Sequence, residues 1–165
     1  MARKATKPKK EKSIEDALWD SCNKLRGSIE PSEYRHVVLS LIFLKYAGDH
    51  FEQKHQQIID QYGKDYADMV EFYTQDNVFY LPPECRWSYI MENAKQDTIF
   101  KIIDDALANI EKANKQLAGA LPSNYYSNLG LDRSKFATLL NSIVNLSREN
   151  HLLRRLLRLM TSKLS

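Results

Sequence analysis

Two consecutive prolines, Pro82 and Pro83, lie within an aromatic-rich stretch, residues 73–90, that joins two helical patterns. Proline fixes its own φ angle, lacks a backbone N–H donor and keeps the preceding residue out of the helical conformation. No helix can therefore run through the middle of this stretch. Its aromatic residues are Tyr73, Phe79, Tyr80, Trp87 and Tyr89. A solvated linker would be polar, so we expect an irregular bridge whose rings pack against a core.

The length and charge pattern indicate one domain with basic ends. A chain of 165 residues most often forms one domain with a real hydrophobic core. Residues 1–12 carry six Lys or Arg and one Glu, a net charge of +5. Residues 148–165 carry five Lys or Arg and one Glu, a net charge of +4. The whole chain has a net charge of +3, which leaves −6 for residues 13–147. If the chain contacts nucleic acid at all, the contact should come from the ends, a local patch or partner subunits, because a body that binds nucleic acid is usually basic.

The sequence gives no sign of export or of membrane insertion. The longest apolar run, residues 37–44, is far too short to span a bilayer, and no apolar stretch follows the basic N-terminus. The two cysteines, Cys22 and Cys85, are far apart in the sequence. We expect reduced thiols and a cytoplasmic protein.

Apolar residues at helical spacing predict an all-α fold, a bundle of five or six helices around the aromatic Pro-Pro bridge. The first predicted helix follows Ser13 and stops at Gly27, with Trp19 beside its apolar stripe. A second, apolar on more than one side, starts near Pro31 and becomes polar after Gly48. This polar continuation is predicted to end at Gly63. Two short helices are predicted next, at 65–73 and near 87–91. A long helix should run from Asp97 or Thr98 to Gly119, and a last helix should start at its cap, Asp132.

Three further expectations concern residues 65–131. In the helix predicted at 65–73, Tyr66, Met69, Val70 and Tyr73 would share one face. Residues 77–81 are the one possible short strand. Residues 120–131, rich in turn formers, are expected to form a loop.

Signals of catalytic chemistry are weak. The four histidines lack the spacing of zinc ligands, and the scattered glycines form no phosphate-binding loop. Asp104 and Asp105 lie within the long predicted helix, where a catalytic carboxylate pair would need a facing cleft. A solvated helix face is the better interpretation of both carboxylates. We therefore expect no catalytic residue, no cofactor-binding residue and no metal ligand in this chain.

The adjacent residues Arg86 and Trp87 have two interpretations. Trp87 can anchor the bridge to the core while Arg86 covers it or caps a helix end. Alternatively, the pair contributes to an interface with a partner or with nucleic acid, because Trp and Arg are enriched at binding hot spots.

Both ends of the chain carry candidate contacts. We expect residues 1–12 to form a disordered basic arm that is either solubilising or phosphate-binding. The candidate phosphate contacts are Arg3, Lys4, Lys7, Lys9, Lys10 and Lys12. Residues 148–165 form an amphipathic tail whose candidate interface residues are Leu152, Leu153, Leu156 and Leu157. Burying four leucines is worth roughly 6–12 kcal/mol before entropy, so this face should close onto the bundle, dimerise or dock on a partner.

Several segments resemble one known family when they are taken together and in order. They are IEDALWDSCNKLRG at 14–27, PSEYRHVVLSLIFLKY at 31–46, FYLPPECRWSY at 79–89, Leu121-Pro122, and FATLLNSI at 136–143. They are similar to the N-terminal helical domain of the modification (M) subunit of type I restriction-modification DNA methyltransferases. The resemblance covers roughly residues 13–147.

That resemblance implies an accessory domain. In this family, two M subunits and one specificity subunit form an adenine-N6 methyltransferase that uses S-adenosylmethionine, and restriction subunits join it. The helical domain packs beside the catalytic domain and helps to enclose DNA, whereas the specificity subunit recognises the DNA sequence. The partners implied are DNA, the specificity and restriction subunits and a second M subunit, with no membrane.

The sequence departs from the family pattern in two respects. The cofactor-binding glycine motif and the Asn-Pro-Pro-aromatic motif of the catalytic domain are absent; Leu81 and Glu84 flank Pro82-Pro83, and neither can bind a flipped base as that motif does. The chain alone should therefore not methylate DNA, although S-adenosylmethionine is expected for the full-length enzyme. The tail at 148–165 does not resemble the family's continuation either.

An alternative from another functional class is a free-standing helical adaptor or regulator that oligomerises through the tail. Deleting residues 148–165 separates the two hypotheses. A folded monomer after deletion favours the domain of a methyltransferase, whereas dissociation of an oligomer favours the adaptor.

Overall fold

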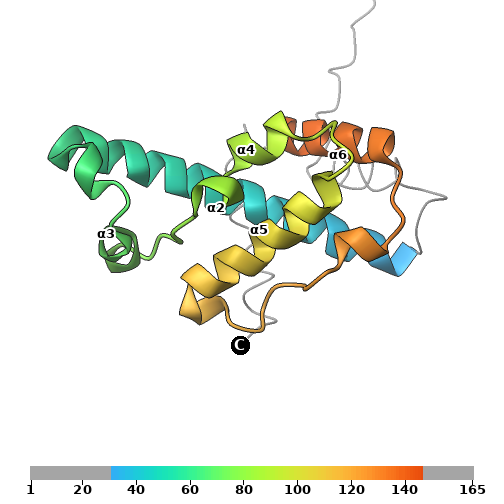
Figure 1. The fold of residues 1–165 in the computed structure, drawn as a ribbon, viewed down its shortest axis with the longest axis horizontal. Coiled ribbons are helices and arrows are strands. Elements are labelled where there is room, and N and C mark those ends of the chain that lie inside the picture. The colour runs from blue at the N-terminus through green and yellow to red at the C-terminus, as the bar shows by residue number, and fades with distance from the viewer. Residues whose placement is uncertain (1–30, 147–165) are drawn as a thin grey trace, which may run out of the picture.

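The computed structural model describes residues 31–146, which are all-α as predicted (Figure 1). Within this range there is no strand, so the possible strand at residues 77–81 is wrong; that segment begins in a turn at Asn77 and forms no regular element. The α-helices are α2 (Pro31–Tyr62), α3 (Val70–Gln75), α4 (Trp87–Glu92), α5 (Ile99–Ala113) and α6 (Arg133–Leu146). The short 3₁₀ turns are η1 (Lys64–Tyr66), η2 (Pro83–Cys85), η3 (Lys115–Leu117) and η4 (Tyr126–Asn128). The predicted basic arm, the helix before Gly27 and the tail lie outside the described residues.

Helix α2 organises the molecule. It has 32 residues and is roughly 48 Å long at 1.5 Å per residue. Its first half is buried on several sides, as predicted for a central helix; the buried apolar residues there are Val37, Val38, Leu41, Ile42, Phe43, Leu44, Ala47 and Phe51. Beyond Phe51 only Ile58 is buried. The helix continues through Gly48 and ends before Gly63, whose φ of 99° suits glycine.

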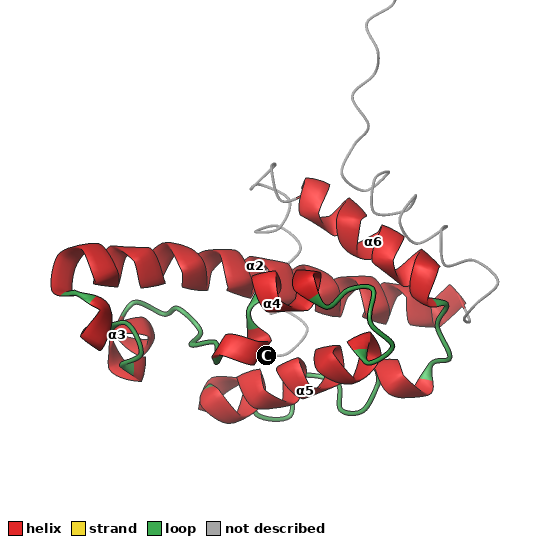
Figure 2. Ribbon diagram, turned by 45° about the horizontal axis from the view of Figure 1, so that its top comes forward, coloured by secondary structure: helices red, strands yellow, loops and turns green. Residues whose placement is uncertain are grey.

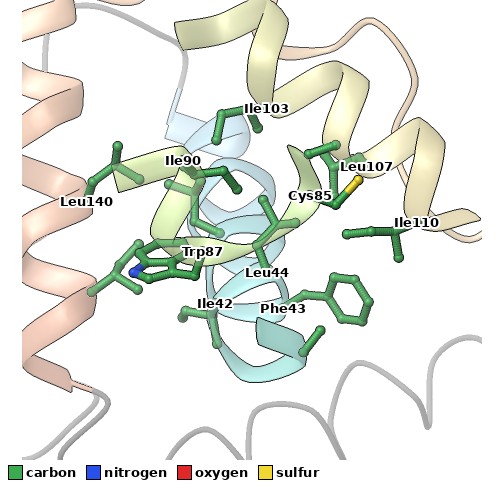
Figure 3. Packing of buried hydrophobic residues seen from close by; sticks show 14 of the residues in the cluster. Ile42, Phe43, Leu44, Cys85, Trp87, Ile90, Ile103, Leu107, Ile110 and Leu140 are labelled. Atoms are coloured by element: carbon green, nitrogen blue, oxygen red, sulfur yellow. The ribbon is translucent and has the colours of Figure 1, made fainter. Parts of the chain in front are cut away.

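Helices α4, α5 and α6 complete the core around the first half of α2. Helices α4 and α6 pack against α2, while α5 packs against α4, η2 and η4. In Figure 3, Leu140 of α6 and Ile42 of α2 lie on either side of Trp87 from α4. The start of α6 confirms the predicted cap, because the Lys135 N–H donates to Asp132 Oδ1 at 3.0 Å.

The helix predicted at 65–73 is wrong. The segment instead forms η1, an extended residue at Met69 and the short helix α3. Of the four residues expected to share one face, only Tyr73 is buried; Tyr66, Met69 and Val70 are 44%, 46% and 38% exposed. The Tyr73 hydroxyl donates to the Ala67 carbonyl, which closes the segment as a turn rather than a helix.

The long predicted helix also ends earlier than Gly119. Helix α5 stops at Ala113, and Gly119, with a φ of 75°, follows the separate turn η3. Asn114, the residue that follows α5, hydrogen-bonds through its side chain to the backbone of Tyr80 in the aromatic bridge.

The second half of α2 extends beyond the rest of the fold. In both views its end carries η1 and α3 and lies away from α5 and α6 (Figures 1 and 2). We call residues 59–76 the projecting end, and the first half of α2 with α5, η4 and α6 the packed end. Among residues 31–146, no helix combines the length and the apolar character needed to cross a membrane.

Candidate functional site

Trp87 lies in the core where α4 meets α2. Its side chain is only 7% exposed. Gly48 permits this contact, because a Cβ at position 48 would lie 3.0 Å from the Trp87 Cβ. The Lys45 Nζ lies 5.8 Å from the centre of the indole ring. The ring therefore anchors the bridge, while its buried Nε1 has no hydrogen-bond acceptor among the described residues.

Arg86 covers the aromatic side of the same junction. Its Nε donates to the Leu81 carbonyl at 3.2 Å, and its guanidinium carbon lies 4.5 Å from the centre of the Phe51 ring. Its Nη2 is 3.6 Å from Asp68 Oδ1. Arg86 thus joins η2, α2 and the projecting end, a role that matches the packing interpretation of the sequence.

Three rings beneath Arg86 hold the projecting end to α2. Phe51 and Tyr73 stack with their centres 5.0 Å apart, and Tyr80 meets both rings edge-on at 5.7 and 5.3 Å. The Tyr73 hydroxyl also lies 3.0 Å from His55 Nδ1. Burial raises the pKa of the Tyr73 hydroxyl to about 12, so it remains a proton donor at neutral pH.

Asp104 is a buried carboxylate, and the prediction that it lies on a solvated helix face is wrong. Its Oδ1 accepts hydrogen bonds from the backbone N–H groups of Tyr125 and Tyr126 at 3.1 and 2.9 Å. Its Oδ2 accepts from the N–H and the hydroxyl of Ser127 at 3.0 and 2.7 Å. The carboxylate therefore organises η4, as a cap does for a helix start. Asp105 is exposed as predicted and binds Lys101 at 2.9 Å.

The turn held by Asp104 presents two tyrosines to the first half of α2. Tyr126 is fully buried, and its hydroxyl donates to the Val37 carbonyl at 2.7 Å. Burial raises the pKa of Tyr126 well above its ordinary value. The Tyr125 hydroxyl donates to the Glu33 carboxylate. The pKa of Tyr125 is raised, mainly by burial and to a lesser extent by this hydrogen bond.

Asn114 fixes the aromatic bridge to the end of α5. Its Oδ1 accepts from the Tyr80 N–H at 3.0 Å, and its Nδ2 donates to the Tyr80 carbonyl at 2.9 Å. The same Nδ2 donates to the Ile110 carbonyl at 2.9 Å. One amide thus satisfies both backbone groups of Tyr80, which lies outside any helix and has no helical partner for them.

The remaining buried polar groups are also accounted for by packing. Lys45 pairs with Asp49 at 2.5 Å. Cys85 is a buried free thiol, and burial raises its pKa to about 12, which makes it a poor nucleophile. No group of three His, Cys, Asp or Glu side chains suited to a metal ion occurs between residues 31 and 146.

Two buried polar side chains, Asp104 and Asn114, position the loops between the helices. Asp104 and Asn114 spend their hydrogen bonds mainly on backbone groups, which fixes the loops between the helices. The six basic residues of the arm and the four leucines of the tail lie outside the described range, so their roles stay predictions. Sequence reasoning missed Asp104; the available signal was a carboxylate flanking the apolar stripe of α5.

Comparison with known proteins agrees with the resemblance of the sequence segments. The family described as the HsdM N-terminal domain matches residues 14–146. The type I restriction enzyme MjaIX methylase subunit of Methanocaldococcus jannaschii is 30% identical over 149 residues, covering 81% of this chain and 26% of that protein. The chain thus spans about a quarter of that relative's length.

Proposed function

Because the chain belongs to the family of HsdM N-terminal domains, we propose that it is a non-catalytic domain of a type I adenine-N6 DNA methyltransferase. In this proposal it helps to enclose DNA and contacts partner subunits in the cytoplasm. The observation that carries the proposal is the family match over residues 14–146. S-adenosylmethionine would bind the catalytic domain of the full-length enzyme, not this chain.

The charge distribution supports contact with DNA through the ends rather than the body. Between residues 31 and 146, acidic residues outnumber Lys and Arg by fifteen to eleven. A surface of this kind repels phosphates unless a local basic patch compensates. Arg3, Lys4, Lys7, Lys9, Lys10 and Lys12 are therefore the proposed phosphate contacts.

The partner subunits proposed are the specificity subunit, the restriction subunits and a second M subunit. The junction at Arg86 and Trp87 is one proposed contact. Its support is the buried Trp87 Nε1, a donor that finds no acceptor within residues 31–146. Such a donor is costly to leave unsatisfied, so an acceptor from a neighbouring segment or subunit would stabilise the junction.

The test of DNA contact compares two variants of the full chain. In the first, the six basic residues of the arm become Gln. In the second, six exposed lysines of the body become Gln, namely Lys64, Lys95, Lys101, Lys112, Lys115 and Lys135. Binding to a fluorescent DNA duplex is followed by anisotropy as salt increases.

We expect the arm variant to bind more weakly and to lose most of its salt dependence. Each phosphate contact contributes a slope of about −0.9 in a plot of log affinity against log salt. The body variant should bind as the parent chain does. If the body variant instead binds more weakly and the arm variant binds as the parent chain does, the arm is not the DNA contact. Transfer of labelled methyl groups from S-adenosylmethionine to adenine by the purified chain would overturn the non-catalytic assignment.

A further inference from the structure

The projecting end exposes an apolar surface that the fold itself does not cover. We propose that this surface binds the Leu/Arg tail, residues 148–165. The inference concerns contacts within this polypeptide and does not depend on the proposed role in DNA methylation.

Exposed apolar side chains gather at this end. The large apolar residues that are exposed in residues 31–146 are Tyr62, Tyr66, Met69, Val70 and Tyr89. All except Tyr89 belong to the projecting end. Contiguous apolar surface of this kind usually marks a binding site, whereas a single exposed residue such as Tyr89 needs no explanation.

The exposed rings are already ordered among themselves. The centre of the Tyr62 ring lies 5.1 Å from that of Phe72 and 6.3 Å from that of Tyr66, and Tyr66 meets Phe72 edge-on at 6.2 Å. Preformed aromatic surfaces lose little conformational entropy when a ligand binds. Tyr and Met are also enriched in the centres of protein interfaces.

The same segment is acidic. Residues 60–76 contain five Asp or Glu and one Lys, a net charge of −4. Two of the carboxylates, Asp65 and Glu71, are exposed and have no hydrogen-bond or ion-pair partner among the described residues. The charge of the projecting end is therefore complementary to a basic ligand and repels nucleic-acid phosphates.

The tail has the complementary composition. Its leucines recur at helical spacing on one face, and its net charge is +4. At this spacing Arg154 and Arg155 border the leucine face, whereas Arg158 lies opposite it. A basic amphipathic helix would place its leucines on the rings and the two bordering arginines near the exposed carboxylates of the projecting end. Helix α6, after which the tail follows in sequence, runs toward the side of the molecule that holds the projecting end (Figures 1 and 2).

A photo-cross-linking experiment on the full chain tests the contact. The photoreactive residue p-benzoylphenylalanine replaces Tyr66, and cross-linked peptides are identified by mass spectrometry after irradiation. The matched control carries the same residue at Tyr89, the exposed aromatic outside the projecting end. We expect cross-links from position 66 to residues 148–165 and none of these from position 89.

Charge reversal sharpens the test. The double variant Asp65→Lys, Glu71→Lys should lower the cross-link yield about fivefold, because it would remove two exposed ion pairs between the projecting end and the tail. Adding Arg154→Glu and Arg155→Glu should restore it. Far-UV circular dichroism verifies the fold of each variant. The cross-linked product should migrate in a denaturing gel as one chain, because the proposal places the tail on its own molecule; a product that migrates as two chains would overturn it.

Hydrogen exchange supplies an independent measurement. Amides of residues 62–72 should exchange faster in the variant Arg154→Glu, Arg155→Glu, Arg158→Glu than in the parent chain. Cross-links from position 66 that avoid the tail, or unchanged exchange at residues 62–72, would overturn the proposal.

Discussion

The packed end of the molecule and the tip of its projecting end, residues 62–72, use tyrosine in opposite ways. At the packed end, Tyr126 is fully buried and donates to the backbone of α2. At the projecting end, Tyr62 and Tyr66 are about half exposed and contact mainly other rings. One helix, α2, carries both regions, so the contrast arises from what packs against each half.

The buried hydrogen bonds of this fold are concentrated at the packed end and at the junction between the two ends. The packed end surrounds Asp104 with four donors from one turn. The junction between the ends is held by Asn114 and by the ring cluster of Phe51, Tyr73 and Tyr80. The tip of the projecting end, residues 62–72, contains no buried polar side chain. Stability should therefore fall from the packed end outward, and substitutions can measure this gradient.

The largest expected effect is at Asp104. Asp104→Ala should lower the free energy of unfolding by about 4 kcal/mol, because the buried donors of η4 lose their acceptors. Urea unfolding measures the change. Asp105→Asn, one residue away on the exposed face, should change it by less than about 0.5 kcal/mol. Equal effects at the two positions would contradict the role assigned to Asp104.

The next effect concerns the junction. Asn114→Ala should lower the free energy of unfolding by about 2 kcal/mol, since both backbone groups of Tyr80 lose their partner. Asn141→Ala on the exposed face of α6 is the control. Hydrogen exchange should show faster exchange of the Tyr80 amide in the first variant. An unchanged rate at Tyr80 would sink this assignment.

Alkaline pH should weaken the junction through Tyr73. Its pKa is raised by burial from an ordinary value near 10 to about 12. The folded state therefore holds its proton more tightly than the unfolded state, and this contribution is complete below pH 10 and is lost as pH rises toward 12. Thermal unfolding measured across that interval should show a smaller decline for Tyr73→Phe than for the parent, by less than about 1.4 kcal/mol per pH unit. Parallel declines would contradict the prediction.

The smallest expected effect lies at the projecting end. Tyr66→Ser should change the free energy of unfolding by less than about 0.5 kcal/mol, because the ring is half exposed. Phe136→Ala, in the core of the packed end, should cost about 3–5 kcal/mol. A large loss from Tyr66→Ser in urea unfolding would mean that the two ends are one cooperative unit of equal strength.

The sequence predicted the parts of this fold that local pattern determines. Apolar spacing located α2, α5 and α6, and the side chain of Asp132 predicted the start of α6. The two prolines predicted an irregular bridge, and the aromatic content predicted that it packs. The family resemblance rested on ordered segments rather than on any single motif, and the match over residues 14–146 confirms it.

Contacts between distant residues were beyond local pattern. Asn114 binds Tyr80, 34 residues earlier, and Asp104 binds a turn more than 20 residues later. Helical spacing at residues 65–73 was likewise outweighed by the bond between Tyr73 and Ala67, which no periodicity shows. For the candidate site, the sequence named Arg86 and Trp87, and the structure adds why Trp87 fits: Gly48 leaves room for it.

Helix α2 has no proline after its first residue and continues without a break for 32 residues. A helix of this kind behaves as a stiff rod, because bending it would stretch successive backbone hydrogen bonds. The far tip of this rod lies roughly 21 Å from Gly48, where Trp87 packs against the helix. A displacement of the aromatic tip would therefore reach the contact between Gly48 and Trp87 through one rigid element.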